Sequence, residues 1–148
     1  SMMRKAAISD LGVCLEMGRQ FHEEAVLPEI PFDEADMSKT LTSLIDGDNS
    51  CLFVAEVGGK VVGMVGAVKY PHYTNSSCHV AQELFWWVRP EFRGGLTGVR
   101  LLMTVEQWAI ETGCKSIVMI CLPIDGPAES IYLRAGYRAL ERSYIKGL

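Results

Sequence analysis

The sequence has no long apolar run, no basic cluster and no secretory pattern, and each absence argues against a class of protein. Its longest apolar run, residues 61–68, is far shorter than the roughly 20 residues that cross a bilayer. The net charge is −4 and no run of Lys or Arg occurs, which argues against nucleic-acid binding through a broad basic surface. No apolar segment follows Arg4-Lys5, so no secretory signal is expected.

Paired cysteines are also missing. The five cysteines are odd in number and include no CxxC pair. Disulfide frameworks and structural zinc sites are built from even sets or close pairs. We therefore interpret the cysteines as reduced residues, most of them in the core, of a cytoplasmic protein without a metal site.

What is present indicates one ordinary globular domain over residues 1–148. Of the 148 residues, 49% are hydrophobic and 22% charged, which suits a soluble domain with a substantial core. Ser9 or Asp10 is expected to cap a first helix and Asp36 a second, and Gly58-Gly59 predicts a two-residue hairpin turn. Strands are expected at residues 3–8, 50–57, 60–70, 78–88, 115–122 and 137–145.

The predicted order of elements is β-α-α-β-β-β-α-β-α-β. A run of strands with scattered helices predicts an α/β protein of the mixed, α+β kind, with helices on the faces of a mixed sheet. The unit from residue 78 to residue 122 should be a parallel, right-handed strand–helix–strand crossover. Residues 115–122 form a continuous apolar run, which is typical of a strand buried on both faces.

The most informative stretch is residues 83–99, where an apolar strand, a glycine-punctuated loop and a helical pattern follow one another. Pro90 ends the strand because it cannot donate to a ladder. The loop amides and the first N–H groups of a helix converge on an anion, so the stretch predicts a phosphate site. Neither the GxxxxGK[ST] of a P-loop nor the GxGxxG of a dinucleotide fold occurs in it.

This stretch resembles motif A of the GNAT family of acyl-CoA N-acyltransferases, (Q/R)-x-x-G-x-(G/A) after a strand that ends in V-x-P. Val88-Arg89-Pro90 and residues 93–98 stand in those places, with Leu96 where the family usually has glycine. Residues 128–137 are similar to the family's A-x-x-x-Y-x-x-x-G-(F/Y) segment. Two motifs in the right order extend the resemblance over essentially the whole chain.

The resemblance implies acetyl-CoA as the cofactor and a mostly antiparallel sheet whose parallel fourth and fifth strands splay apart. The pantetheine arm would enter the splay beside the backbone of residues 86–88. The expected cofactor-binding residues are Trp86, Trp87, Val88, Arg93, Gly94, Gly95, Leu96, Thr97, Gly98 and Asp125. The departure at Leu96 keeps an alternative open, a non-catalytic acyl-CoA-binding module with the same fold.

Acetyl transfer from a thioester to an amine needs a base for the amine and an acid for the leaving thiolate. The resemblance places Tyr132 as the acid; the alternative is a core tyrosine. Glu83, a carboxylate entering an apolar strand, is the predicted base, because burial raises the pKa of a carboxyl toward a useful range. A structural ion pair at Glu83, a water-mediated base and a role for His79 stay open.

Acidic residues near the end of the first expected helix suggest how an acceptor amine could be bound. His22, Glu23, Glu24 and Glu29 form an acidic stretch that would attract a cationic amine, although a solvated helix end explains them equally well. We interpret Cys121 as an inert core cysteine and not as a nucleophile. The acceptor is expected to be a small-molecule amine, a protein N-terminus or a lysine, with no nucleic-acid or membrane partner, and a homodimer is left open.

Overall fold

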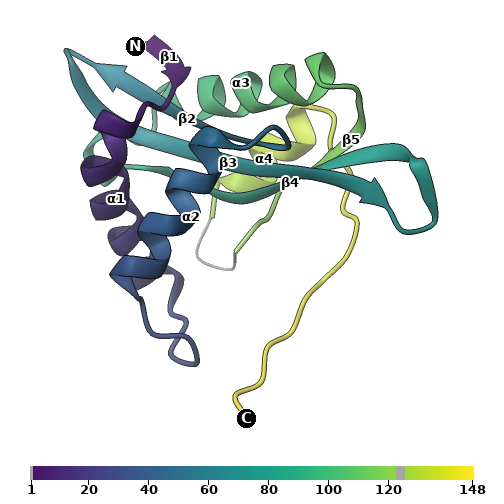
Figure 1. Ribbon diagram of the computed structural model, residues 1–148, viewed down its shortest axis with the longest axis horizontal. Helices are drawn as coiled ribbons and strands as arrows, with labels where there is room; N and C mark the ends of the chain where they lie inside the picture. The colour runs from purple at the N-terminus through teal and green to yellow at the C-terminus, as the bar shows by residue number, and fades with distance from the viewer. Residues whose placement is uncertain (1, 123–125) are drawn as a thin grey trace.

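The described part of the chain contains five strands and four α-helices (Figure 1). The computed structural model describes residues 2–122 and 126–148. The strands are β1 Met2–Lys5, β2 Ser50–Val57, β3 Lys60–His72, β4 Asn75–Val88 and β5 Cys114–Val118. The helices are α1 Leu11–Ala25, α2 Glu34–Asp46, α3 Thr97–Glu111 and α4 Ala128–Arg134, with short 3-10 turns at Ile8–Asp10 and Pro90–Phe92. No helix in the described part of the chain is long and apolar enough to span a membrane.

The strands lie in the order β1-β2-β3-β4-β5 in one sheet. All neighbours pair antiparallel except β4 and β5, which are parallel. The turn between β2 and β3 has φ 58° at Gly58 and 79° at Gly59, the left-handed conformations that a tight hairpin requires. The predicted mixed, mostly antiparallel sheet is confirmed.

Helices cover both faces of the sheet, as expected, and each face has its own apolar core. On one face α1 and α2 contribute Cys14, Met17, Leu41 and Leu44 to a cluster with Phe85 and Trp87 of β4. On the other face α3 and α4 contribute residues such as Leu101, Val105 and Tyr132 to a cluster with Ala81 and Val88 of β4. Strand β4 is therefore buried between two layers of helices.

A β-bulge in β4 decides which of its side chains face which helices. Gly66 of β3 pairs with Phe85, whereas the next residue, Ala67, pairs with Glu83, so Leu84 is the extra residue. A Cβ on Gly66 would lie 2.6 Å from Cζ of Phe85, so only glycine lets the Phe85 ring lie there. Because alternation restarts after a bulge, Glu83 lies on the α3/α4 face and Phe85 on the α1/α2 face.

Strands β4 and β5 pair over only a short distance. His79 to Gln82 of β4 are the residues that pair with β5, and β4 continues to Val88 without a strand on that edge among the described residues. The two parallel strands therefore part after Gln82. Over residues 84–88 this edge of β4 has no strand partner in the described part of the chain, in agreement with the splay that the resemblance implies.

Three sequence predictions about the elements were wrong. The last expected strand, residues 137–145, is not formed, because these residues meet no partner strand in the described structure. The fifth strand ends at Val118, and its burial ranges from half-buried to exposed, so it is not a central strand covered on both faces. Helix α2 begins after Asp33, whose Oδ1 accepts a hydrogen bond from Asp36 N at 2.9 Å, so Asp33 is the cap and Asp36 its partner.

Smaller differences concern the ends of the other elements. Strand β3 extends to His72 and β4 starts at Asn75, so both strands are longer than expected and the hairpin between them is tight. Asp10 precedes α1 but its side chain does not cap that helix. Of the five cysteines, Cys14 and Cys51 are buried, so the expectation that most of them lie in the core was wrong.

Candidate functional site

The loop before α3 has the geometry of an anion site. Gly94 takes φ 89°, which favours glycine, and the first hydrogen bond of the helix runs from Arg100 N to Leu96 O at 2.9 Å. No side chain caps the helix. The N–H groups of the first turn therefore have no partner within the helix, and the helix dipole adds to their attraction for an anion.

Leu96 fits this loop without strain. Its φ is −95° and its ψ −7°, a conformation that any residue adopts, and its side chain points to solvent with 61% exposure. A glycine at this position is therefore not required by the backbone. The departure at Leu96 does not strain the backbone of the loop.

Trp86 fastens the start of α3 to β4. Its Nε1 donates a hydrogen bond to Gly98 O at 3.0 Å, and a Cβ on Gly98 would meet Cζ2 of Trp86 at 3.5 Å, an ordinary contact. The open edge of β4 and the first turn of α3 are thereby held in a fixed relation. Among the predicted cofactor-binding residues, Trp86 and Gly98 are therefore in direct contact.

Arg93 points away from that loop. Its Nε donates to Val88 O at 2.7 Å, and its Nη2 lies 3.0 Å from both carboxylate oxygens of Glu24 on α1. The guanidinium carbon lies 5.3 Å from the ring centre of Trp87. Arg93 therefore bridges the end of β4 to α1, and it contacts the strand carbonyl beside which pantetheine was expected.

Glu83 is buried on the α3/α4 face, with 3% exposure. Its charge contributes to a raised pKa at Tyr137, although burial and the hydrogen bond from the Tyr137 hydroxyl to Glu106 Oε2 are larger causes. That hydrogen bond is 2.9 Å long. The predicted base therefore lies near a part-buried hydrogen bond between Tyr137 and Glu106, neither of which was predicted to take part.

Tyr132 lies next to this group. Its hydroxyl donates to Ile120 O at 2.7 Å, just beyond the end of β5. Its ring centre is 5.5 Å from that of Trp86 and 5.5 Å from that of Tyr137. Tyr132 therefore joins α4 to the segment after β5, on the same face of the sheet as Glu83. The structure brings the predicted acid and base to one face.

The remaining predicted residues are more scattered. His79 has the parity of Glu83 on β4, with no bulge between them, and is half-buried. Trp87 and Phe85 face the other core. Cys121 is exposed, so its interpretation as a core cysteine was wrong. Asp125 lies outside the described residues.

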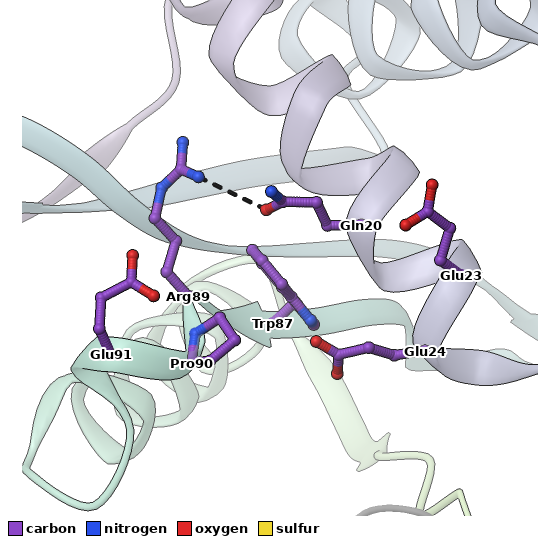
Figure 2. A pocket seen from close by; sticks show the side chains of 7 residues that line it. All are labelled: Gln20, Glu23, Glu24, Trp87, Arg89, Pro90 and Glu91. Atoms are coloured by element: carbon purple, nitrogen blue, oxygen red, sulfur yellow. Dashed lines mark hydrogen bonds between the residues drawn. The ribbon is translucent and has the colours of Figure 1, made fainter.

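An acidic pocket of about 410 Å³ lies between α1 and the end of β4 (Figure 2). Three glutamates and one arginine are among the lining residues, which are Gln20, Glu23, Glu24, Trp87, Arg89, Pro90 and Glu91. Figure 2 shows Arg89 turned toward α1, where its Nη1 lies 3.4 Å from Gln20 Oε1. Of the acidic stretch predicted on α1, Glu23 and Glu24 reach this pocket.

Sequence reasoning missed part of this pocket. Arg89, the middle residue of the V-x-P motif, was not predicted to line it; its Nε donates to Val61 O at 3.4 Å and its Nη1 lies 3.7 Å from Glu16. The indole Nε1 of Trp87 is buried and has no hydrogen-bond partner among the described residues. Side chains alternate between the two faces of a strand, but the bulge at Leu84 shifts this alternation. Without knowledge of the bulge, the sequence could not assign Trp87 to the α1/α2 face.

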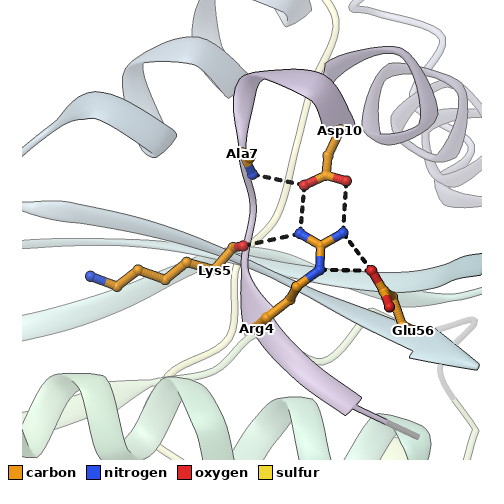
Figure 3. Close-up of polar contacts among 5 residues, drawn as sticks. All are labelled: Arg4, Lys5, Ala7, Asp10 and Glu56. Atoms are coloured by element: carbon orange, nitrogen blue, oxygen red, sulfur yellow. Dashed lines mark hydrogen bonds and ion pairs between the residues drawn. The ribbon is translucent and has the colours of Figure 1, made fainter. Parts of the chain in front are cut away.

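A second polar cluster is structural (Figure 3). Arg4 binds both oxygens of Asp10, at 2.7 and 2.9 Å, and Oε1 of Glu56 at 2.7 Å, and Asp10 also accepts from Ala7 N at 2.7 Å. The hydrogen bond from Arg4 is the main cause that lowers the pKa of Asp10. The cluster ties β1, the turn after it and β2 together, which explains why Asp10 does not cap α1.

Comparison with known proteins agrees with this geometry. The profile of the acetyltransferase (GNAT) family matches residues 18–137, so the chain belongs to that family. It is 30% identical over 107 residues to the probable N-acetyltransferase camello of Xenopus tropicalis, covering 72% of this chain and 47% of that protein. It is 26% identical over 113 residues to the aminoglycoside N(6')-acetyltransferase type 1 of Stenotrophomonas maltophilia, covering 74% of each.

Solved structures share the fold. The aminoglycoside N-acetyltransferase AAC(6')-Iy in complex with CoA superposes with a TM-score of 0.80 at 19% identity, covering 98% of this chain and 92% of that one. A predicted acetyltransferase with acetyl-CoA from Clostridium acetobutylicum gives 0.78 at 18% identity, covering 98% and 96%. The chain spans about half the length of the camello protein.

Proposed function

We propose that the chain is an acetyl-CoA-dependent N-acetyltransferase that transfers the acetyl group directly to an amine. The observation that carries the proposal is the edge of β4 over residues 84–88, which has no strand partner among the described residues. At one end of this edge lie Glu83 and Tyr132, and at the other lies the uncapped start of α3. A thioester with a long arm and a phosphate head suits a site of this shape.

Each part of the cofactor has a place in this arrangement. The pyrophosphate binds the amides of residues 94–98, because the first turn of α3 offers unpaired N–H groups and a favourable dipole. The amides of the pantetheine arm bond to the open backbone of residues 86–88, as a further strand would. Arg93 gives up its contact with Val88 O, or shares that oxygen, when the arm binds.

The roles of the two reacting side chains follow from their position. Glu83 removes the proton of the attacking amine, directly or through a water molecule, and Tyr132 protonates the departing thiolate. The amine nitrogen attacks the thioester carbon and forms a tetrahedral intermediate. This intermediate collapses when the C–S bond breaks, and the new C–N bond remains. Both groups lie on the α3/α4 face, where burial excludes bulk water and strengthens their electrostatic effects.

The acceptor proposed here is an extended amine with more than one positive charge. The acidic pocket attracts cations, but Trp87, which lines it, is four residues along the strand from Glu83. Four residues of strand span about 13 Å, and Glu83 and Trp87 face opposite sides of the sheet, so an amine held in the pocket reaches Glu83 only if the molecule is long and passes around the edge of β4. An aminoglycoside, the substrate named for one relative, has this character, as does a linear polyamine.

The test is product formation with a panel of amines. Purified protein is incubated with acetyl-CoA and a linear triamine, an aminoglycoside, an amino-acid amide or a peptide with a free N-terminus, and acetylated product is measured by mass spectrometry. We expect the highest kcat/KM for the polycations and a decline with added salt. A preference for the amino-acid amide or the peptide, which carry fewer amine charges, over the polycations would contradict the assignment of the pocket.

The alternative function, a non-catalytic acyl-CoA-binding module, predicts a different outcome. CoA would then raise the melting temperature by mass action, but no acetylated product would form with any member of the panel. The intact burial of Glu83 and Tyr132 and the unstrained Leu96 favour the enzyme. Comparing thermal stabilisation with turnover in the same preparation decides between the two.

A further inference from the structure

The acidic pocket between α1 and the end of β4 contains a hydrogen-bond donor that no described residue satisfies. Trp87 lines this pocket and is 4% exposed, and its indole Nε1 is buried without a hydrogen-bond partner in the described part of the chain. A buried donor that has left water and gained no acceptor destabilises the fold. Nearly all buried donors in folded proteins are paired, so a ligand that supplies an acceptor accounts for this one.

Two side chains beside the indole bind each other and not the indole nitrogen. The guanidinium carbon of Arg93 lies 5.3 Å from the ring centre of Trp87, and a guanidinium has donors only. Both carboxylate oxygens of Glu24 lie 3.0 Å from Nη2 of Arg93. Figure 2 shows the nitrogen end of the indole turned toward the Glu24 side of the pocket. The donor therefore faces an acidic surrounding whose nearest carboxylate is already engaged.

Two other carboxylates of the pocket lie on either side of Trp87. In the view of Figure 2, Glu91 is on one side of the indole and Glu23 on the other. Neither makes an ion pair with another residue that the structure describes. The positive charge of Arg89 lies 3.7 Å from Glu16, outside the set of lining residues. The pocket therefore offers two negative charges with an unsatisfied N–H group between them.

A ligand made of ammonium groups alone satisfies the carboxylates but not the indole. An ammonium group and an indole N–H are both donors and have no acceptor. An alkyl amine has a pKa of about 10, as the lysine side chain does, and stays protonated at neutral pH. A linear polyamine therefore leaves Trp87 unpaired, and the missing acceptor must be an oxygen atom of the ligand.

We propose that this pocket binds an amino alcohol unit in which an oxygen atom lies between two ammonium groups, and that Trp87 determines this specificity. The oxygen accepts a hydrogen bond from Trp87 Nε1, and the ammonium groups pair with Glu23 and Glu91. Arg93 moves off the indole when the unit binds; its ion pair with Glu24 is exposed on both sides and opens at a small cost. The inference rests on the proposed function only in taking this unit as the remote end of the acceptor, and it favours an oxygen-bearing polycation over a linear polyamine.

The test compares two probes that differ by one hydroxyl. One is a linear three-carbon diamine with an amine at each end, and the other is the same diamine with a hydroxyl on its central carbon. Dissociation constants for the full chain are measured by calorimetry. Trp87→Phe removes the indole N–H and keeps an aromatic ring. Trp108→Phe makes the same change at a buried tryptophan in the core of the other face and is the matched control.

We expect the hydroxylated probe to bind about tenfold more tightly, because it satisfies a buried donor. A hydroxyl lowers the pKa of nearby amines, so charge alone would favour the plain diamine. In Trp87→Phe the two affinities should become equal, and in Trp108→Phe the preference should remain. In proton–nitrogen NMR of the unmodified chain, the indole N–H signal of Trp87 should move downfield with the hydroxylated probe only. The three tryptophans give three such signals, and Trp86→Phe and Trp108→Phe assign that of Trp87 by elimination.

Equal binding of the two probes by the unmodified chain would overturn the inference, and so would a preference that survives in Trp87→Phe. If Trp87→Phe does not fold, an indole signal that responds to neither probe still refutes the hydrogen bond, because that measurement uses the unmodified chain. The proposed function fails separately. A preference for the hydroxylated probe without any acetylated product from the amine panel supports the amino alcohol site and refutes the enzyme, whereas turnover without the preference supports the enzyme and refutes the site.

Discussion

The substitution Tyr132→Phe separates the structural role of the tyrosine from its proposed chemical role. It removes the hydroxyl that donates to Ile120 O at 2.7 Å and keeps the ring beside Trp86 and Tyr137. One intramolecular hydrogen bond contributes about 1 kcal/mol to stability. For a chain of this length that loss lowers Tm by about 2–4 °C. The fold should survive.

The loss in turnover should be much larger than the loss in stability. A positioned acid or base contributes about 10²- to 10⁴-fold to a rate. If Tyr132 protonates the thiolate, kcat should fall by that factor, and the basic limb of the pH–rate profile should disappear. The loss should shrink with an acetyl-CoA analogue whose thiol is more acidic, because a better leaving group needs less help.

The assay is a thermal melt followed by initial rates with the two acyl donors. Tyr73→Phe is the control, because Tyr73 is 93% exposed in the β3–β4 hairpin and also loses only a hydroxyl. It should change neither Tm nor kcat. An equal loss of rate with both donors in Tyr132→Phe would refute proton donation and would show that the hydroxyl only positions the segment at Ile120.

Three further predictions test other parts of the structure. Glu83→Gln should lower kcat by about 10²- to 10⁴-fold with CoA affinity unchanged by calorimetry; near-normal turnover would move the base to His79. Gly98→Pro removes an amide donor and should weaken CoA binding at least tenfold, whereas Gly98→Ala keeps the donor, its Cβ makes an ordinary 3.5 Å contact, and it should bind normally. Asp10 has a lowered pKa in the folded state, so its contribution is complete above the unfolded pKa of about 4 and is lost as the pH falls through the lowered value. Asp10→Asn should therefore cost about 1–3 kcal/mol at pH 7 and flatten the acid decline in urea unfolding; an unchanged decline would show that other carboxylates cause it.

Local signals predicted most of the elements because each depends on nearby residues. Gly58 and Gly59 predicted the hairpin turn between β2 and β3. Gly113, at φ 85°, follows the end of α3, a position where glycine is common. The glycine loop before α3 and the tyrosine on α4 could be found by motif. Glu83 was expected to be buried because an apolar strand surrounds it, and it is.

Features that depend on distant contacts could not be predicted. The bulge at Leu84 arises where Phe85 packs against Gly66 of the neighbouring strand, and no local pattern encodes that contact. Arg93 bonds to Glu24, which lies 69 residues earlier. The strand expected at residues 137–145 is not formed, because strand propensity is a property of one segment, whereas a strand also needs a neighbouring segment to pair with.

Arg93 would compete with the proposed cofactor arm for Val88 O. The guanidinium already satisfies Val88 O and is neutralised by Glu24, so an arriving cofactor arm must exchange one set of hydrogen bonds for another. Both side chains of that ion pair are well exposed, at 43% and 36%, and such pairs contribute about 1 kcal/mol or less. Under the proposed placement of the cofactor arm, binding at Val88 O therefore replaces one hydrogen-bond donor by another at a small free-energy cost, and Arg93 keeps that carbonyl hydrogen-bonded until the arm arrives.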